Sequence, residues 1–186
     1  MRWLASPDEL APWLSPNPPH PGQKQVSYEA ELLKALQASI ADLGVAGVHG
    51  QGADNKFAVD GWELSPLQQF QYGDLRIELA DTTLIVEAES AGGITNLVKY
   101  WPLLRSGTLA KRLVILHVYM LGSSADYIAH RKLWSFLVDR MAEDLAVNGI
   151  GRPEKWDAQL ITYHKGGSLG EVTALLRKMV TESGDF

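Results

Sequence analysis

The 186-residue sequence contains no cysteine. Disulfide bonds and zinc sites built on thiolates are therefore excluded. The sequence also lacks the Gly-x-Ser-x-Gly nucleophile elbow and the GxxxxGK[ST] phosphate loop. Its five histidines show no ligand spacing such as His-x-x-x-His. These absences argue against a serine hydrolase of the elbow type, a phosphate-loop nucleotide-binding protein and a histidine-based metal centre.

The chain has neither a basic excess nor a long apolar run. Its formal net charge is -5, which argues against a strongly basic nucleic-acid surface and leaves room for a locally basic groove. No apolar segment is long enough to span a membrane, and no secretory signal is apparent at the N-terminus. Together with the lack of cysteine, these features predict a cytoplasmic protein with no membrane partner.

Composition divides the chain into two parts. Residues 1–26 are rich in proline and include Trp3 and Trp13. They predict an irregular arm that packs either on the rest of the protein or on a second subunit, and the second alternative would make the protein a homodimer. Residues 27–186 are predicted to form a single α/β domain, since a chain of this length and composition is typical of one globular unit.

Hydrophobic periodicity predicts the elements of this domain. Helices are expected at 28–43, 95–104, 125–147 and 168–180. Strands are expected at 57–64, 72–79, 83–89, 113–121 and 158–163. Ser27 is expected to cap the first helix and Gly44 to end it. The predicted order is α-β-β-β-α-β-α-β-α.

Three carboxylates stand out in the predicted hairpin, which contains the sequence GDLRIELADTTLIVEAE. Side chains alternate between the two faces of a strand, so Glu87 and Glu89 share a face roughly 7 Å apart. If the loop contains an even number of residues, Asp74 lies opposite Glu89 on that same face, roughly 5 Å away. Such a cluster among apolar residues can coordinate Mg²⁺, which prefers carboxylate oxygens.

The same pattern also fits an ordinary solvated face. An antiparallel hairpin often exposes one polar face, and Arg76 could pair with Glu87 across the two strands. A shift of one residue in the register would send the carboxylates to opposite faces. The hairpin alone therefore leaves both interpretations open.

The element order and the acidic residues together resemble the PD-(D/E)xK nuclease superfamily, over roughly residues 27–120. The resemblance implies a restriction-endonuclease-like α-β-β-β-α-β core with a mixed sheet flanked by helices. Asp74, preceded by Gly73, matches the aspartate that begins the second core strand. Glu87-Ala88-Glu89 matches the acid-x-lysine motif of the third strand, with Glu89 where lysine is expected. Some type II restriction endonucleases of this superfamily carry Glu-x-Glu there, and so could an inactive copy.

The helix after this motif in the superfamily often carries Gln-x-x-x-Tyr. Here the corresponding segment reads Asn96-Leu97-Val98-Lys99-Tyr100, with Asn96 in place of glutamine. Asn96, Lys99 and Tyr100 share one helix face because of their spacing. By the resemblance, Lys99 replaces the missing motif lysine from the helix. A plain salt bridge between Lys99 and Glu87 or Glu89 fits the spacing equally well.

The first helix of the superfamily often adds a glutamate to the site. Glu29 aligns with the apolar stripe of the predicted helix, whereas Glu31 points outward, so Glu29 is the better candidate. An ordinary acid in the first helical turn is the alternative for Glu29. The resemblance thus implies Mg²⁺ or Mn²⁺ held by Asp74, Glu87 and Glu29, with Glu89 and Lys99 joining Asp74 and Glu87 in catalysis.

The function predicted from the resemblance is metal-dependent hydrolysis of phosphodiester bonds in DNA, in restriction, repair or mobile elements. Phosphate contacts are expected from five residues. These are Asn96, Tyr100, Arg105, Lys111 and Arg112. A second hypothesis is a catalytically inactive relative that serves as a binding or assembly module, which Glu89 and the negative charge favour. A third is a small-molecule-binding α/β protein, if the hairpin register differs.

Overall fold

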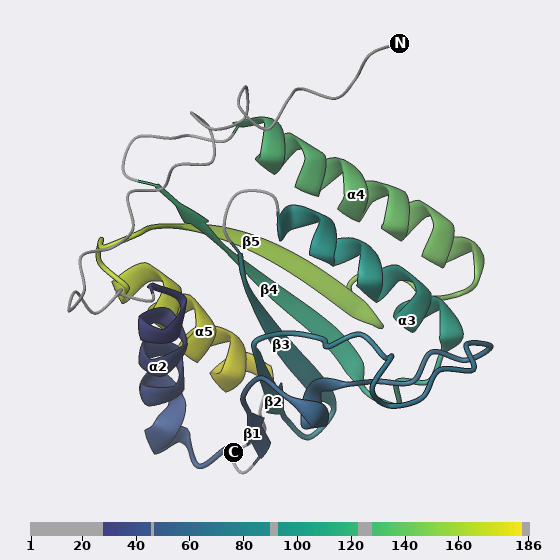
Figure 1. Cartoon of the computed structure of the whole chain (residues 1–186), viewed down its shortest axis with the longest axis horizontal. Coiled ribbons are helices and arrows are strands. Elements are labelled where there is room, and N and C mark those ends of the chain that lie inside the picture. The colour runs from purple at the N-terminus through teal and green to yellow at the C-terminus, as the bar shows by residue number, and fades with distance from the viewer. Residues whose placement is uncertain (1–27, 46, 90–92, 123–127, 184–186) are drawn as a thin grey trace, which may run out of the picture.

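Five strands form one mixed sheet that carries helices on both faces (Figure 1). The computed structural model describes residues 28–45, 47–89, 93–122 and 128–183. The strands follow one another in space as they do along the chain: β1 (Gly47–His49), β2 (Leu75–Glu78), β3 (Thr82–Glu89), β4 (Arg112–Leu121) and β5 (Trp156–His164). The pairs β1–β2 and β2–β3 are antiparallel, and β3–β4 and β4–β5 are parallel.

The longer helices are α2 (Tyr28–Ile40), α3 (Tyr100–Ser106), α4 (Ile128–Val147) and α5 (Gly170–Ser183). Three short 3₁₀ segments are η1 (Ala41–Leu43), η2 (Ala53–Asn55) and η3 (Gly93–Lys99). α2 and α5 lie against one face of the sheet, and α3 and α4 lie against the other (Figure 1). The fold is therefore a three-layer α/β arrangement.

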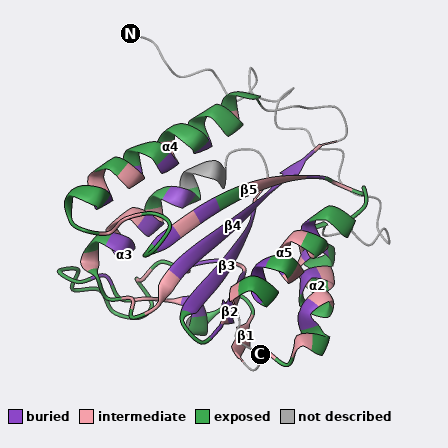
Figure 2. Cartoon of the chain, turned by 180° about the vertical axis from the view of Figure 1, so that it is seen from behind, coloured by how far each residue is buried: buried purple, intermediate pink, exposed green. Residues whose placement is uncertain are grey.

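Both faces of the central strands are buried, and each face has its own apolar core. Leu36 of α2 and Leu176 of α5 pack with Val86 and Leu116 on the first face. Tyr100 of α3 and Met141 of α4 pack with Ile115 on the second face. Figure 2 shows β3 and β4 as buried, whereas the outer surfaces of α4 and α5 are largely exposed. This double coverage explains the unbroken apolar sequence of β4.

The hairpin between β2 and β3 forms as the alternation predicts. Leu79 N donates to Thr82 O at 2.9 Å, so Ala80 and Asp81 form the loop, an even number of residues. Gly73 enters the hairpin with φ +79°, and a Cβ atom added there would lie 2.3 Å from Ile85 Cγ2. Only glycine fits this close approach, because a side chain would be both strained and clashing.

The predicted order of elements is confirmed, with one strand in the wrong place. Residues 57–64 do not form a strand, because Gly61 turns the chain with φ +78°. The first strand is instead β1, at the start of a glycine-rich segment. Gly47 brings β1 close to β2, where a Cβ atom would lie 2.7 Å from Glu78 Cβ. Three residues without alternation are too few to show a strand in the sequence.

The other predicted elements are confirmed with small changes at their ends. The first helix becomes 3₁₀ after Ile40 and ends at Gly44, which has φ +67°. The helix predicted at 95–104 is divided into η3 and α3. Pro102 lies in the first turn of α3, where its missing N–H costs no helical hydrogen bond. None of the described helices is long and apolar enough to cross a membrane. The predicted arm at 1–26 and the predicted cap Ser27 lie outside the described residues.

Candidate functional site

The carboxylates of the hairpin lie on the face of the sheet that α3 and α4 cover. Leu75 pairs with Val86, which places Asp74 level with Glu87. The expectation that Asp74 lies opposite Glu89 is therefore wrong by two residues, because the loop is shorter than assumed. The parity is preserved, so Asp74, Glu87 and Glu89 still share one face.

Glu87 is a buried carboxylate with three donors around a single oxygen. The residue is 3 % exposed. Lys99 Nζ lies 2.6 Å from Glu87 Oε1, and Gly73 N donates to the same atom at 2.9 Å. Tyr100 OH also donates to Oε1. Burial raises the pKa of Glu87, and the nearby charge of Lys99 opposes that rise. The alternative that Arg76 pairs with Glu87 is not what the structure shows, since Arg76 pairs with Glu78.

Asp74 is held by one backbone and one side-chain donor. Ala88 N donates to Asp74 Oδ2 at 2.8 Å, and Gln51 Nε2 donates to Asp74 Oδ1 at 2.6 Å. The same Gln51 nitrogen donates to Glu29 Oε1 at 2.9 Å. Glu29 in the first turn of α2 is thereby brought to Asp74, although the two residues lie on different elements. The choice of Glu29 over Glu31 agrees with this placement.

Glu89 ends β3 beside the other acids. Asn96 Nδ2, in η3, donates to Glu89 Oε1. Burial raises the pKa of Glu89 to about 7, and the negative charges of Glu87 and Asp74 add to the rise. The acidic end of the hairpin therefore repels a further negative charge and favours either a proton or a cation.

Tyr100, Tyr72 and His117 are buried residues next to the carboxylate of Glu87 or to one another. Tyr100 packs edge-on against Tyr72 with ring centroids 5.3 Å apart. His117 of β4 is paired in register with Glu87 and is fully buried. Neither of its ring nitrogens has a hydrogen-bond partner among the described residues. Burial lowers the pKa of His117 to about 4, and the positive charge of Lys99 contributes, so the ring is neutral at neutral pH.

The donor atoms at this end of the hairpin are those that Mg²⁺ prefers. Among the described residues, no three His, Asp or Glu side chains are arranged to hold a metal ion as they stand. Mg²⁺ commonly uses only one or two carboxylates and keeps several waters. Asp74 and Glu87 supply two carboxylates, and the three donors on Glu87 all use Oε1 rather than Oε2. Asp74 and Glu87 thus have the donor chemistry of such an ion, although the described side chains are not arranged around one.

The predicted phosphate-binding residues are only partly brought together. Asn96 and Tyr100 contact the acids directly. Lys111 and Arg112 lie at the start of β4, level with Thr82, which is roughly 20 Å along β3 from Glu89. Lys111 pairs with Glu78 there. Arg105 pairs with Asp144 of α4 at 3.6 Å. Lys111, Arg112 and Arg105 therefore make their contacts away from the acidic site.

Two members of the site were not identified from the sequence. Gln51 lies between β1 and η2, and a single glutamine carries no motif. His117 lies in an apolar strand, and its ring nitrogens are unpaired among the described residues. Only its register with Glu87, which requires the strand order, links it to the site.

Comparison with known proteins adds no relative: no protein-family model, no curated protein and no solved structure matches this chain.

Proposed function

We propose that this protein is a metal-dependent nuclease that hydrolyses phosphodiester bonds in DNA, with a restriction-endonuclease-like core of the PD-(D/E)xK kind. One observation carries the proposal. Three carboxylates share one face of the hairpin, and the ammonium group of Lys99 lies 2.6 Å from the most deeply buried of them, Glu87. Lys99 of η3 thus lies beside β3, where Glu89 occupies the position at which the superfamily motif has lysine.

Asp74 and Glu87 would hold Mg²⁺ or Mn²⁺, with Glu29 as the additional acid on the α2 side. The bound ion would lower the pKa of a coordinated water and neutralise charge on the phosphate. Lys99 is the group in reach to stabilise negative charge on the phosphorus oxygens, since its ammonium is held in place by Glu87. Glu89 would accept a proton from the attacking water, and its carboxyl group accepts a hydrogen bond from Asn96.

A second candidate is a nuclease-fold protein without catalysis, acting as a binding or assembly module. Specific contacts favour it as well: Lys99 pairs with Glu87, and the amide of Gln51 donates to both Glu29 and Asp74, so these three acids have protein donors without a ligand. The basic residues Lys111 and Arg112 also lie away from the acids. This candidate predicts DNA or protein binding that does not depend on a divalent cation.

The decisive experiment compares Glu87→Gln with Glu78→Gln in plasmid cleavage. Both substitutions remove one carboxylate from the same face of the hairpin, and only Glu87 belongs to the site. We expect cleavage by the wild type to require Mg²⁺ or Mn²⁺. Glu87→Gln should lower the rate by about 100-fold or more, since it removes a charge from the reacting centre. Glu78→Gln should cleave at nearly the wild-type rate.

Equal loss in both variants would mean that destabilisation, not chemistry, explains the effect. Cleavage by Glu87→Gln at the wild-type rate would contradict the proposed site. Cation-independent DNA binding with no cleavage on supercoiled, linear and single-stranded substrates would favour the non-catalytic candidate.

A further inference from the structure

Gln51 occupies the space between two carboxylates from different elements. Its Nε2 atom lies 2.9 Å from Glu29 Oε1 and 2.6 Å from Asp74 Oδ1. Glu29 belongs to α2 and Asp74 to the start of the hairpin. A primary amide nitrogen carries two protons, so it can satisfy both acceptors at once. The reverse orientation would direct the amide oxygen at two negative charges.

The chemistry of this bridge is that of a weak cation substitute. The two amide protons carry partial positive charge, and they meet one oxygen each of Glu29 and Asp74, two of the three acids assigned to the proposed cation. An amide compensates the two negative charges far less than a metal ion does, because its own net charge is zero. The bridge therefore links the two acids with less charge compensation than a bound cation would supply.

The position of Gln51 in the chain suits displacement. It is exposed and lies between Gly50 and Gly52, in the segment that joins β1 to η2. Gly52 has φ +137°, and a Cβ atom added there would meet nothing within 4 Å. The side chain is thus attached to a backbone with few packing constraints, unlike Lys99 and Tyr100, which are fixed on η3 and α3.

We propose that Gln51 is a displaceable place-holder whose amide occupies the cation position between Glu29 and Asp74. It competes with the divalent ion and so sets the ion's affinity. This inference rests on the proposed function, because it assumes that a cation binds at these acids. It adds a regulatory residue that keeps Glu29 and Asp74 together in the metal-free protein.

Two opposite substitutions test the place-holder. Gln51→Ala leaves the two carboxylates facing each other with no donor between them. We expect its affinity for Mg²⁺ alone, measured by calorimetry, to rise by about tenfold, the effect of losing a hydrogen bond to a charged group. Its melting temperature in EDTA should fall, and added Mg²⁺ should raise it by more than in the wild type. The matched control is Gln159→Ala, which changes an exposed glutamine on β5. It should leave the Mg²⁺ affinity and the melting temperature unchanged.

Gln51→Lys should act in the other direction, because an ammonium group supplies the full positive charge permanently. Its melting temperature in EDTA should rise, and Mg²⁺ binding should weaken by at least tenfold. Unchanged or weaker Mg²⁺ binding by Gln51→Ala, in a protein whose wild type binds Mg²⁺, would overturn the place-holder role and leave the proposed function standing. No binding by the wild type, by Gln51→Ala or by Glu87→Gln at millimolar Mg²⁺ would overturn the metal site itself.

Discussion

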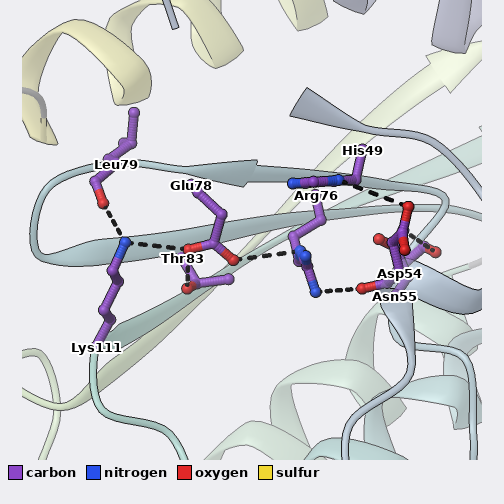
Figure 3. A network of polar contacts seen from close by, with 9 residues as sticks. His49, Asp54, Asn55, Arg76, Glu78, Leu79, Thr83 and Lys111 are labelled. Atoms are coloured by element: carbon purple, nitrogen blue, oxygen red, sulfur yellow. Dashed lines mark hydrogen bonds and ion pairs between the residues drawn. The ribbon is translucent and has the colours of Figure 1, made fainter. Parts of the chain in front are cut away.

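Two groups of charged residues lie on the same face of β2 and β3, and they are built differently. At the loop end of the hairpin, Glu78 accepts from Thr83 at 3.0 Å and pairs with both Arg76 and Lys111, each at 3.2 Å (Figure 3). Arg76 also stacks over Phe57, 5.1 Å from the ring centroid. We call these residues the balanced network, because Arg76 and Lys111 compensate the charge of Glu78.

The opposite end of the hairpin is the acidic site of Asp74, Glu87, Glu89 and Glu29. Among the described residues, the ion pair at this site joins Lys99 to Glu87. Burial and mutual repulsion raise the pKa of Glu89 there. A set of charges that satisfies itself indicates a structural role, whereas an uncompensated set on the same strands indicates a place for a ligand. The difference in charge compensation between the two ends of the hairpin therefore supports the proposed ligand site at the acidic end.

Removing the lysine from each group should give the largest difference in folding free energy between the two ends of the hairpin. Lys99→Ala leaves the buried carboxylate of Glu87 without its cation, which typically costs about 3 kcal/mol of folding free energy. Lys111→Ala removes a half-exposed partner of Glu78 and should cost about 0.5 kcal/mol, since surface pairs contribute little. Urea denaturation of both variants at pH 8 measures the two losses. Equal losses would mean that burial does not distinguish the two groups.

Neutralising one acid in each group should shift stability in opposite directions. The pKa of Glu89 rises to about 7 in the folded protein from about 4.5 when unfolded, so its stabilising proton is retained below pH 4.5 and lost as the pH rises through 7. Glu89→Gln keeps the protonated shape. It should therefore be more stable than the wild type at pH 8 in EDTA, by about 1 kcal/mol because Glu89 is only partly buried.

This gain should vanish below pH 4.5, where the wild type is itself protonated. Glu78→Gln should instead lose about 1 kcal/mol at pH 8, because it weakens the contacts to Arg76 and Lys111. Thermal denaturation between pH 4 and pH 8 follows both variants. A destabilised Glu89→Gln at pH 8 would show that Glu89 is a satisfied acid like Glu78.

Much of the fold was predictable because its signals are local. The alternation in β2 and β3, the continuous apolar run of β4 and the glycine after η1 each fix an element from a few residues. The strand β1 was missed because it has three residues and no pattern of its own. It exists because Gly47 allows close contact with Glu78, a tertiary effect.

The site was predictable to the extent that parity determines it. Asp74, Glu87 and Glu89 share a face because strand side chains alternate. Lys99, at the end of η3, and Tyr100, at the start of α3, both contact Glu87. The role of Gln51 depends on a loop that meets two separate elements. The isolation of Lys111 and Arg112 from the acids depends on where β4 begins relative to β3. Neither fact is encoded in a short stretch of sequence.

The most direct test of the central claim measures Mn²⁺ binding by electron paramagnetic resonance. The wild type, Asp74→Asn and Glu78→Gln are compared, each with and without a DNA duplex. The uncompensated acids predict saturable binding by the wild type, a loss of at least tenfold in affinity in Asp74→Asn, and little change in Glu78→Gln. The absence of saturable binding by the wild type at millimolar Mn²⁺, with and without DNA, would contradict a metal-dependent nuclease and leave the acidic end of the hairpin without its proposed role.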